Sequence, residues 1–422
     1  MATITYNGNS VAVKQVETFQ VTTDDAGTTY TMTVGSGNVI ATVAVAGTGT
    51  GVNDTASAIQ VACDASAHPY FTAIAWTVST DTVTGTAGTA GCPFIAAASA
   101  AGATGAIGAG TVATASSGPN DWETAANWDS GTVPVSNDTI IIGVGTPNIA
   151  SGMDQSGVTG TTFHHQRGAG NIGLRPSAFA TTADGTGVDT TVPEYRDTYL
   201  DLPATTTYIG EAYGPGLATG ATSIRINNTK AGAANTYVRS VAGTSSVTGK
   251  PVLNLQLNHA SSDVWVDSAV GGLGLGVDDT SQTFTGGDIN VYDKTGTSRV
   301  YIGPGVTWSI YAQQSGTSVI SNANAGATTT KIRGGICTMR DSWTTGPTIT
   351  VNKGATVNWA ANSAAISTLQ GDGAFNCSTA TVMPNINAFA PELGFVFTCG
   401  ELGVDFSTGT TDPDGSYTLT YS

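Results

Sequence analysis

Basic residues are scarce in this 422-residue sequence. Only 10% of the residues are charged, and 14 Lys and Arg stand against 30 Asp and Glu, so the formal net charge is −16. Proteins that bind nucleic acid neutralise its phosphates with clusters of Lys and Arg, and anionic membranes attract basic segments in the same way. The composition therefore excludes nucleic acid as a partner and disfavours a membrane surface.

Long hydrophobic runs are missing as well. No run of eighteen or more apolar residues occurs, and the opening MATITYNGNSVAVKQ has neither the charged region nor the apolar region of a secretory signal peptide. We therefore expect a protein that is made in the cytoplasm of its host and does not insert into a membrane.

Cysteine is sparse. The five cysteines are too few and too scattered for a disulfide framework, and no CxxC motif occurs: Cys63, Cys92, Cys337, Cys377 and Cys399. We interpret them as small buried hydrophobic residues. In the repeat described below, Cys337 and Cys377 are both expected to point inward and to stack on neighbouring turns.

Glycine, by contrast, is abundant, with 55 residues, and 40% of the chain is hydrophobic. Disordered chains combine low hydrophobicity with high charge, so this chain is expected to fold. Thr, Val, Ile and Ala predominate between the glycines, which is typical of a mainly β protein with many tight turns. The length suggests two or three domains.

Residues 1–118 are predicted to form a small α+β domain of order ββαββ, in which one helix covers one face of a mostly antiparallel sheet. The predicted elements are strands at Val11–Val21, Thr28–Val45, Phe71–Trp76, Thr82–Thr86 and Pro93–Ala98, and a helix at Val52–Ser66. Asn53 or Asp54 is expected to cap the helix. Its apolar stripe is expected to consist of Ala58, Ile59, Ala62 and Ala65. Residues 99–117 are a last strand or a linker.

The stretches TYTMTVG, NDTASAIQVACDA and FTAIAWTVSTDTVTGTAGTAGCPFIAAA resemble a small domain that recurs in phage tail proteins, other virion proteins and large surface proteins. The segment Thr84–Phe94 looks like the final hairpin of that domain. The resemblance implies that residues 1–118 anchor or dock the protein.

Residues 120–142, NDWETAANWDSGTVPVSNDTIII, separate this unit from short β-rich runs that continue almost to the end of the chain. Trp122 and Trp128 each offer a large apolar face and one N–H donor, which suits a cap over the edge of a core. We therefore expect the segment to cap the entry of a second domain, residues 119–422.

A repeat runs through the C-terminal half. Five glycines, each after a polar turn, follow one another at spacings of 20, 19, 19 and 19 residues: Gly296, Gly316, Gly335, Gly354 and Gly373. A period of about 20 residues is typical of solenoids, whose stacked turns share one continuous core. We expect the glycines to need positive φ in the turns. The final strands, Leu402–Phe406 and Ser416–Tyr421, are expected to cover the far end of the stack.

Four stretches of the second region resemble a family of uncharacterised β-helical proteins from phages and planctomycete-type bacteria: NDWETAANW, MDQSGVTGTTFHHQRGAGNIGL, PEYRDTYLDLPATTTYIG and VLNLQLNHASSDVWVDSAVGGLGL. The similarity extends over nearly the whole chain. It implies a right-handed parallel β-helix and a place on a virion or a cell surface, and it brings no catalytic residues with it.

Residues 150–250 are less regular than the rest of the second region. Within them Tyr195, Arg196 and Tyr199 belong to the densest cluster of charged and aromatic residues. Tyr and Arg are enriched at interface hot spots, so the cluster suits an intersubunit contact. An insertion loop folded over the side of the β-helix explains it equally well.

No cofactor site and no metal site is predicted. His164 and His165 are adjacent, and neighbouring residues of a strand point to opposite faces, so they cannot easily share one metal ion. The segment Asp412–Gly415 lacks the glutamate that would close a calcium loop, and Asp-Gly favours a hairpin turn.

No catalytic residue is predicted either. Nucleophile-elbow, zinc-protease and phosphate-loop motifs do not occur. Two carboxylate pairs, Asp263 with Asp267 and Asp278 with Asp279, remain candidates for glycoside hydrolysis. Most acids of this chain lie in Gly- and Thr-rich turns, where Asp is expected for backbone reasons.

These observations favour a structural virion protein of a bacteriophage: a capsid decoration, head fibre or tail-fibre appendage, and a homotrimer. Its partners would be other virion proteins, such as the major capsid or tail proteins, and a host surface glycan. In the trimer, Trp265, Trp308 and Trp359 would be buried between subunits. The alternatives are a polysaccharide-binding adhesin on a bacterial cell surface and a polysaccharide depolymerase of tailspike type.

Overall fold

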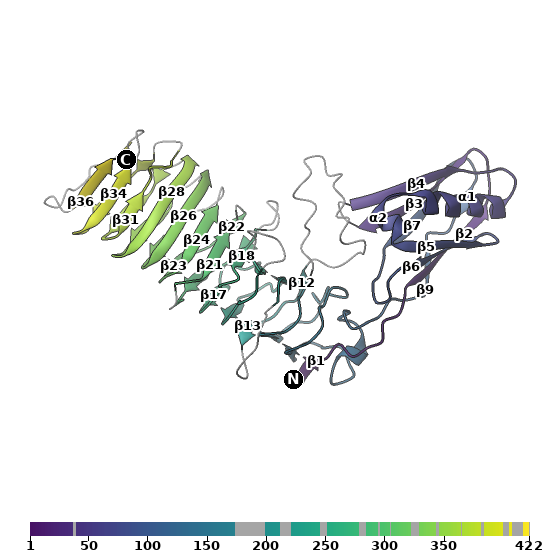
Figure 1. Ribbon diagram of the computed structural model, residues 1–422, viewed down its shortest axis with the longest axis horizontal. Helices are drawn as coiled ribbons and strands as arrows, with labels where there is room; N and C mark the ends of the chain where they lie inside the picture. The colour runs from purple at the N-terminus through teal and green to yellow at the C-terminus, as the bar shows by residue number, and fades with distance from the viewer. Residues whose placement is uncertain are drawn as a thin grey trace.

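The computed structural model describes residues 1–36, 39–173, 199–211, 221–244, 251–277, 284–293, 296–303, 305–321, 329–342, 346–363, 365–380, 384–399, 405–406 and 417–421. Within these residues the protein is mainly β, as predicted, and most strands belong to two long parallel sheets (Figure 1). The strands stack along an elongated body, and a unit that carries the helices lies beside the N-terminal end of this body.

The first sheet has twelve strands among the described residues, and neighbouring strands pair in parallel. In sheet order they are β1 (Thr3–Tyr6), β10 (Thr139–Ile142), β11 (Thr162–Gln166), β13 (Thr206–Glu211), β15 (Asn235–Val238), β17 (Asp263–Val266), β20 (Asp288–Val291), β23 (Ile310–Gln313), β25 (Thr329–Ile332), β27 (Thr348–Val351), β30 (Thr368–Gly371) and β33 (Phe389–Pro391).

The second sheet has eleven strands in the same part of the chain, again all parallel. In sheet order they are β12 (Leu200–Asp201), β14 (Ile224–Asn228), β16 (Leu253–Leu257), β18 (Leu273–Leu275), β21 (Arg299–Ile302), β24 (Thr317–Ser321), β26 (Gly335–Ser342), β28 (Ala355–Ser363), β31 (Ala374–Asn376), β34 (Phe395–Cys399) and β36 (Tyr417–Tyr421).

Two smaller parallel stacks accompany the long sheets: β19 (Phe284–Thr285) with β22 (Val306–Thr307), and β29 (Ala365–Ile366) with β32 (Asn385–Ile386) and β35 (Asp405–Phe406). From β11 to β34 the chain visits the two long sheets alternately, so each turn adds one strand to each sheet. Parallel strands that follow one another in this order form a β-helix-like solenoid.

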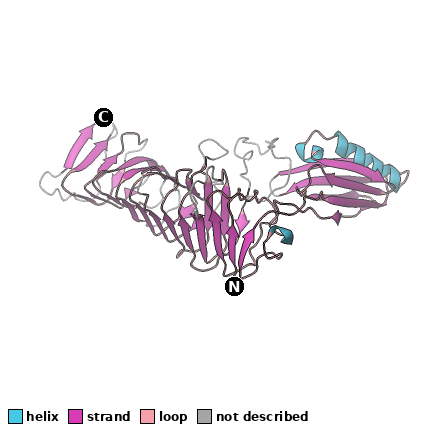
Figure 2. Ribbon diagram, turned by 60° about the horizontal axis from the view of Figure 1, so that its bottom comes forward, coloured by secondary structure: helices cyan, strands magenta, loops and turns pink. Residues whose placement is uncertain are grey.

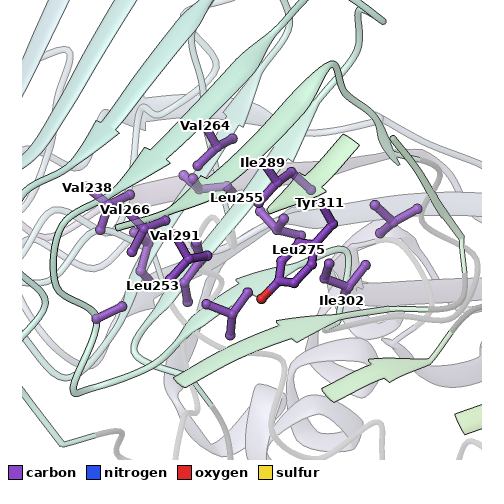
Figure 3. Close-up of a cluster of buried hydrophobic side chains, with 14 of the residues drawn as sticks. Val238, Leu253, Leu255, Val264, Val266, Leu275, Ile289, Val291, Ile302 and Tyr311 are labelled. Carbon is purple, nitrogen blue, oxygen red and sulfur yellow. The ribbon is translucent and has the colours of Figure 1, made fainter. Parts of the chain in front are cut away.

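The core of the solenoid consists of columns of inward side chains. One column runs through Val264, Ile289, Tyr311, Thr330 and Ile349, each paired in register with the next, and all five are buried. Figure 3 shows apolar side chains of the two sheets converging on one interior. Full burial of a Val, Leu or Ile stabilises a fold by about 1.5–3 kcal/mol, so the repeated columns supply the main stabilising term.

Glycines with positive φ precede or begin several strands of the second sheet. Four of the predicted turn glycines have this conformation, with φ of 72° at Gly296, 90° at Gly316, 76° at Gly335 and 82° at Gly354. Gly373 does not, but a Cβ there would lie 2.4 Å from the carbonyl oxygen of Asn352, so the close approach of the backbone requires glycine. The same position before β18 and β34 is taken by two more glycines of positive φ, Gly272 and Gly394.

The first strand lies in the solenoid, away from the small unit with which residues 1–118 were grouped. β1 pairs in parallel with β10, so Thr3–Tyr6 form the first strand of the long sheet. The segment around the short 3-10 helix η1 (Ala125–Asn127) packs against it, because the Trp128 ring meets the Tyr6 ring edge-on at a centroid distance of 4.9 Å. At the far end, β35 and β36 correspond to parts of the two predicted final strands.

Between β1 and β10 the chain forms the helix-bearing unit, whose strands are antiparallel (Figure 2). One sheet has the order β4 (Val39–Ala46), β3 (Thr28–Ser36), β7 (Ala96–Gly102). The other has the order β5 (Ile74–Ser79), β6 (Thr82–Ala87), β2 (Val16–Thr23), β8 (Ala106–Ile107), with β9 (Thr111–Thr114) also on β2. The helix α1 (Val52–Ala65) lies over these strands, and α2 (Pro69–Thr72) follows it.

Several details of this unit differ from the sequence prediction. The predicted strand Thr28–Val45 is a hairpin of two strands, and the predicted strand Phe71–Trp76 starts as α2, because Pro69 has the backbone geometry of a first helical residue. The helix is capped by the backbone of Gly51, with no side-chain hydrogen bond from Asn53 or Asp54. Its buried residues are Thr55, Ala56, Ile59 and Cys63, so the apolar stripe is rotated from the predicted one.

Candidate functional site

The outer face of the first sheet carries a continuous ladder of aromatic rings. It consists of His164 on β11, Tyr208 on β13, Tyr237 on β15 and Trp265 on β17, which pair in register from strand to strand. Residues on either side of each ring point into the core, so strand alternation directs all four rings outward. We call these four residues the aromatic ladder.

The rings of the aromatic ladder stack nearly parallel to one another. Their centroids are 4.7, 5.1 and 4.9 Å apart, and the ring planes differ by 16°, 14° and 13°. Planes in contact are about 3.5–4.0 Å apart, so each ring is displaced sideways by about 3 Å from its neighbour. The rings therefore overlap only partly, and each of the four residues remains partly exposed to solvent.

Polar side chains flank the aromatic ladder on both sides. On one side lie the first residues of the same strands, Thr162, Thr206, Asn235 and Asp263. On the other side lie Glu211, Arg239 and Asp267. Hydroxyl, amide, guanidinium and carboxylate groups thus border the rings along their whole length, and all of these groups form directed hydrogen bonds.

Glu211, Arg239 and Asp267 each contact an ionisable side chain beside the rings. Glu211 Oε2 is 3.1 Å from His164 Nδ1, and Arg239 donates a hydrogen bond of 2.5 Å to Asp267. The Arg239 guanidinium also lies 5.2 Å from the centroid of Tyr237, within cation–π range. The hydrogen bond to Asp267 raises the pKa of Arg239 above its usual value, so the arginine stays charged.

The ladder ends at Trp265 in the direction of the C-terminus. The residue in register on the next strand is Asn290, followed by Ala312 and Lys331. Trp265 therefore has a ring against one face only, while an amide side chain follows on the other. The aromatic ladder and its polar border, together called the strip below, offer planar apolar contacts along the ladder and hydrogen-bonding groups at its two edges.

The two adjacent histidines point to opposite faces, as the alternation of strand residues requires. His164 is part of the ladder, whereas His165 is buried and its Nε2 is 2.8 Å from the carbonyl oxygen of Gly170. Burial lowers the pKa of His165 to about 4, so the neutral ring donates this hydrogen bond. Among the described residues, no three His, Cys, Asp or Glu side chains gather closely enough to hold a metal ion.

Of the carboxylates considered for catalysis, Asp263 and Asp267 do not form a close pair. Asp263 begins β17 and Asp267 directly follows it, so the two are about 13 Å apart along the backbone at the usual rise per residue. Paired glycosidase carboxyls are about 5–9.5 Å apart. Asp263 accepts a hydrogen bond from the backbone N–H of Asp288, and Asp267 is held by Arg239. Asp278, Asp279 and the segment 412–415 lie outside the described residues.

Both tryptophans of the predicted cap are buried beside the first strand. Trp122 and Trp128 meet edge-on at a centroid distance of 4.8 Å, and the Trp128 indole N–H donates to the carbonyl oxygen of Trp122. Tyr195 and Arg196 lie outside the described residues, whereas Tyr199 is half-buried, 5.9 Å from the guanidinium of the buried Arg225.

The proposed trimer contact needs one correction. Trp308 and Trp359 are 4% and 1% exposed inside the solenoid of a single chain, so they cannot supply an apolar face between subunits. Only Trp265 of the three points outward.

The cysteine stacking also differs from the prediction. Cys337 is in register with Val357, and Val357 with Phe375, so its column does not contain Cys377. Cys377 follows β31, and its backbone N–H donates to the carbonyl oxygen of Thr398 on β34. All five cysteines are buried.

The aromatic ladder was not predicted from the sequence. The sequence does contain four similar tetrapeptides, TFHH, TTYI, NTYV and DVWV, each with a polar residue in the first position and a ring-bearing residue in the third. The segments between these tetrapeptides differ in length, so a search for a constant period does not find them.

Fold and site together define a β-solenoid with an outward aromatic ladder. No family model matches the chain, and no curated protein and no solved structure is significantly similar to it. In the part of the chain that the structure describes, no helix has the length and apolar character needed to cross a membrane.

Proposed function

We propose that this protein is a structural component of a bacteriophage virion, a capsid decoration, head fibre or tail-fibre appendage whose solenoid forms the projecting body. The observation that carries the proposal is the unbroken stack of twelve strands with one continuous core. Parallel strands are about 4.8 Å apart, so this stack is roughly 50 Å long. A stiff body of this kind suits mechanical projection from a surface.

The helix-bearing unit supports an anchoring role. It is inserted between β1 and β10, at the first turn of the solenoid, and it has its own core around Phe19, Met32 and Trp76. Two chain connections to the base of the rod hold such a unit more firmly than one would. In this proposal the unit docks on the particle or on its neighbours in a homotrimer, and the solenoid is right-handed.

Particles purified from a producing culture provide the test. Mass spectrometry of the purified particles should detect the protein at a constant ratio to the major capsid or tail protein. Light scattering coupled to size exclusion should give about 127 kDa for a trimer of the 42.3 kDa chain. Absence of the protein from purified particles would refute the virion role, and a mass of one chain would refute the trimer alone.

The aromatic ladder favours a second function, adhesion to a surface polysaccharide. A virion appendage and an adhesin differ in location and share the same binding chemistry, so this function is compatible with the first. Shortening of a polysaccharide by the purified protein would instead indicate a depolymerase.

A further inference from the structure

We propose that the aromatic ladder is a binding site for an extended neutral polysaccharide that lies along the outer face of the first sheet. This inference concerns a ligand of the solenoid itself, and it does not depend on the particle or surface to which the protein belongs.

The first argument is the shape of the strip. Sugar rings present faces of C–H groups that pack on aromatic rings, and the offset between ladder rings means that no ring is fully covered by its neighbour. The three centroid separations of 4.7, 5.1 and 4.9 Å make the strip about 15 Å long. A strip this long contacts several consecutive sugars, so it suits a polymer better than a single sugar.

The second argument is the polar border. A polysaccharide packed on the rings places its hydroxyl groups beside the strip, where Asn235 and Asp263 lie on one side and Glu211, Arg239 and Asp267 on the other. Planar amide, guanidinium and carboxylate groups pair with hydroxyls as donors, acceptors or both. A purely structural stack of rings would not require this border on both sides.

The third argument is charge, which selects a neutral ligand. Arg239 is already held by Asp267, and His164 Nδ1 lies 3.1 Å from Glu211, so neither of these two basic side chains beside the rings is free to pair with a sulfate or carboxylate. The chain as a whole has a net charge of −16, which repels polyanions. Acidic polysaccharides are therefore expected to bind poorly.

The full-length protein is tested by affinity electrophoresis in gels that contain one soluble polysaccharide each. The neutral probes are dextran, a mixed-linkage β-glucan and a galactomannan; alginate serves as the polyanion and chitosan as the polycation. We expect at least one neutral probe to retard the protein and alginate to leave it unaffected. No retardation by any neutral probe, or retardation by chitosan alone, would overturn the proposal.

Variants then locate the site. Tyr237→Ala and Trp265→Ala should each weaken binding about tenfold, whereas Trp265→Phe, which keeps an aromatic face, should weaken it by about threefold or less. Tyr301→Ala is the matched control, because Tyr301 is a half-buried outward tyrosine on β21 of the other sheet. Equal losses in Tyr301→Ala and Tyr237→Ala would overturn the proposal.

A second measurement on the unmodified protein covers the case in which a variant fails to fold. Trp265 is the half-exposed tryptophan of the strip, so a bound polysaccharide should protect it from quenching by acrylamide. This protection should be absent in Trp265→Phe. Retardation without protection would place the sugar elsewhere and contradict the assignment.

Discussion

Replacement of Gly335 by alanine should destabilise the solenoid more than the same change at Gly354. The two glycines have nearly equal φ, 76° and 82°, and both precede or begin a strand of the second sheet. Their surroundings differ. A Cβ on Gly335 would lie 2.1 Å from the carbonyl oxygen of Gly316, whereas a Cβ on Gly354 would have no atom within 4 Å.

The comparison separates two costs. A side chain at positive φ costs about 1–2 kcal/mol, and we expect this amount for Gly354→Ala. Gly335→Ala has the same strain and also displaces the Gly316 carbonyl, which accepts hydrogen bonds from the Ile336 N–H and from Gln313. Forcing atoms into a packed site adds about 1–3 kcal/mol, so the total is about 2–5 kcal/mol.

Urea unfolding followed by circular dichroism measures the shift of the midpoint, and hydrogen exchange at the Ile336 amide reports the local opening. Asp372→Asn is the control, because an asparagine oxygen can still accept the hydrogen bond from the Lys353 N–H, and its effect should stay within about 0.5 kcal/mol. Equal destabilisation by Gly335→Ala and Gly354→Ala would refute the steric argument. An equal effect of Asp372→Asn would refute the importance of the turn glycines.

Three further predictions follow from buried polar groups. The pKa of His165 is lowered from 6.5 to about 4, so as the pH falls the unfolded state takes up the proton before the folded state does. The free energy of unfolding should therefore fall by up to about 3 kcal/mol between pH 6.5 and pH 4. The variant His165→Gln should lack this part of the pH dependence in urea unfolding. Gln313→Leu should cost about 2–4 kcal/mol in the same assay, because Tyr311 and Ser318 lose a buried hydrogen-bond partner; a neutral effect would contradict the network. Burial raises the pKa of Cys377 to about 12, and the other four cysteines are buried as well, so no cysteine should react with a disulfide reagent until the protein unfolds. Rapid labelling of the folded protein would show that the core is accessible.

The sequence was sufficient for the stacked architecture of the C-terminal half, because glycine is chemically distinctive in turns. Gly316, Gly335 and Gly354 recur at a nearly constant spacing and all adopt positive φ in the structure. Composition likewise predicted a mainly β chain. These signals are local and do not depend on which segments meet in space.

Features that depend on contacts between segments far apart in the sequence could not be predicted from such local patterns. Nothing in Thr3–Tyr6 indicates that it pairs with Thr139–Ile142, because its alternation of polar and apolar residues suits any half-buried strand. Trp308 and Trp359 were predicted at a subunit contact because tryptophan suits interfaces. In the structure the interior of one chain is wide enough to contain both.

The aromatic ladder shows why a period search finds one half of a solenoid and misses the other. Successive ladder residues are 44, 29 and 28 positions apart, whereas Ile310, Thr329 and Thr348 of the same sheet are 19 apart. Register is set by inward side chains and by hydrogen bonds between neighbouring strands, and these constrain each strand while leaving the length of the connecting turn free. Turn length can therefore vary without moving a ring out of line. The outer face of the N-terminal half keeps its aromatic column through turns of very different length, so the property that stays constant there is the position of a ring within its strand.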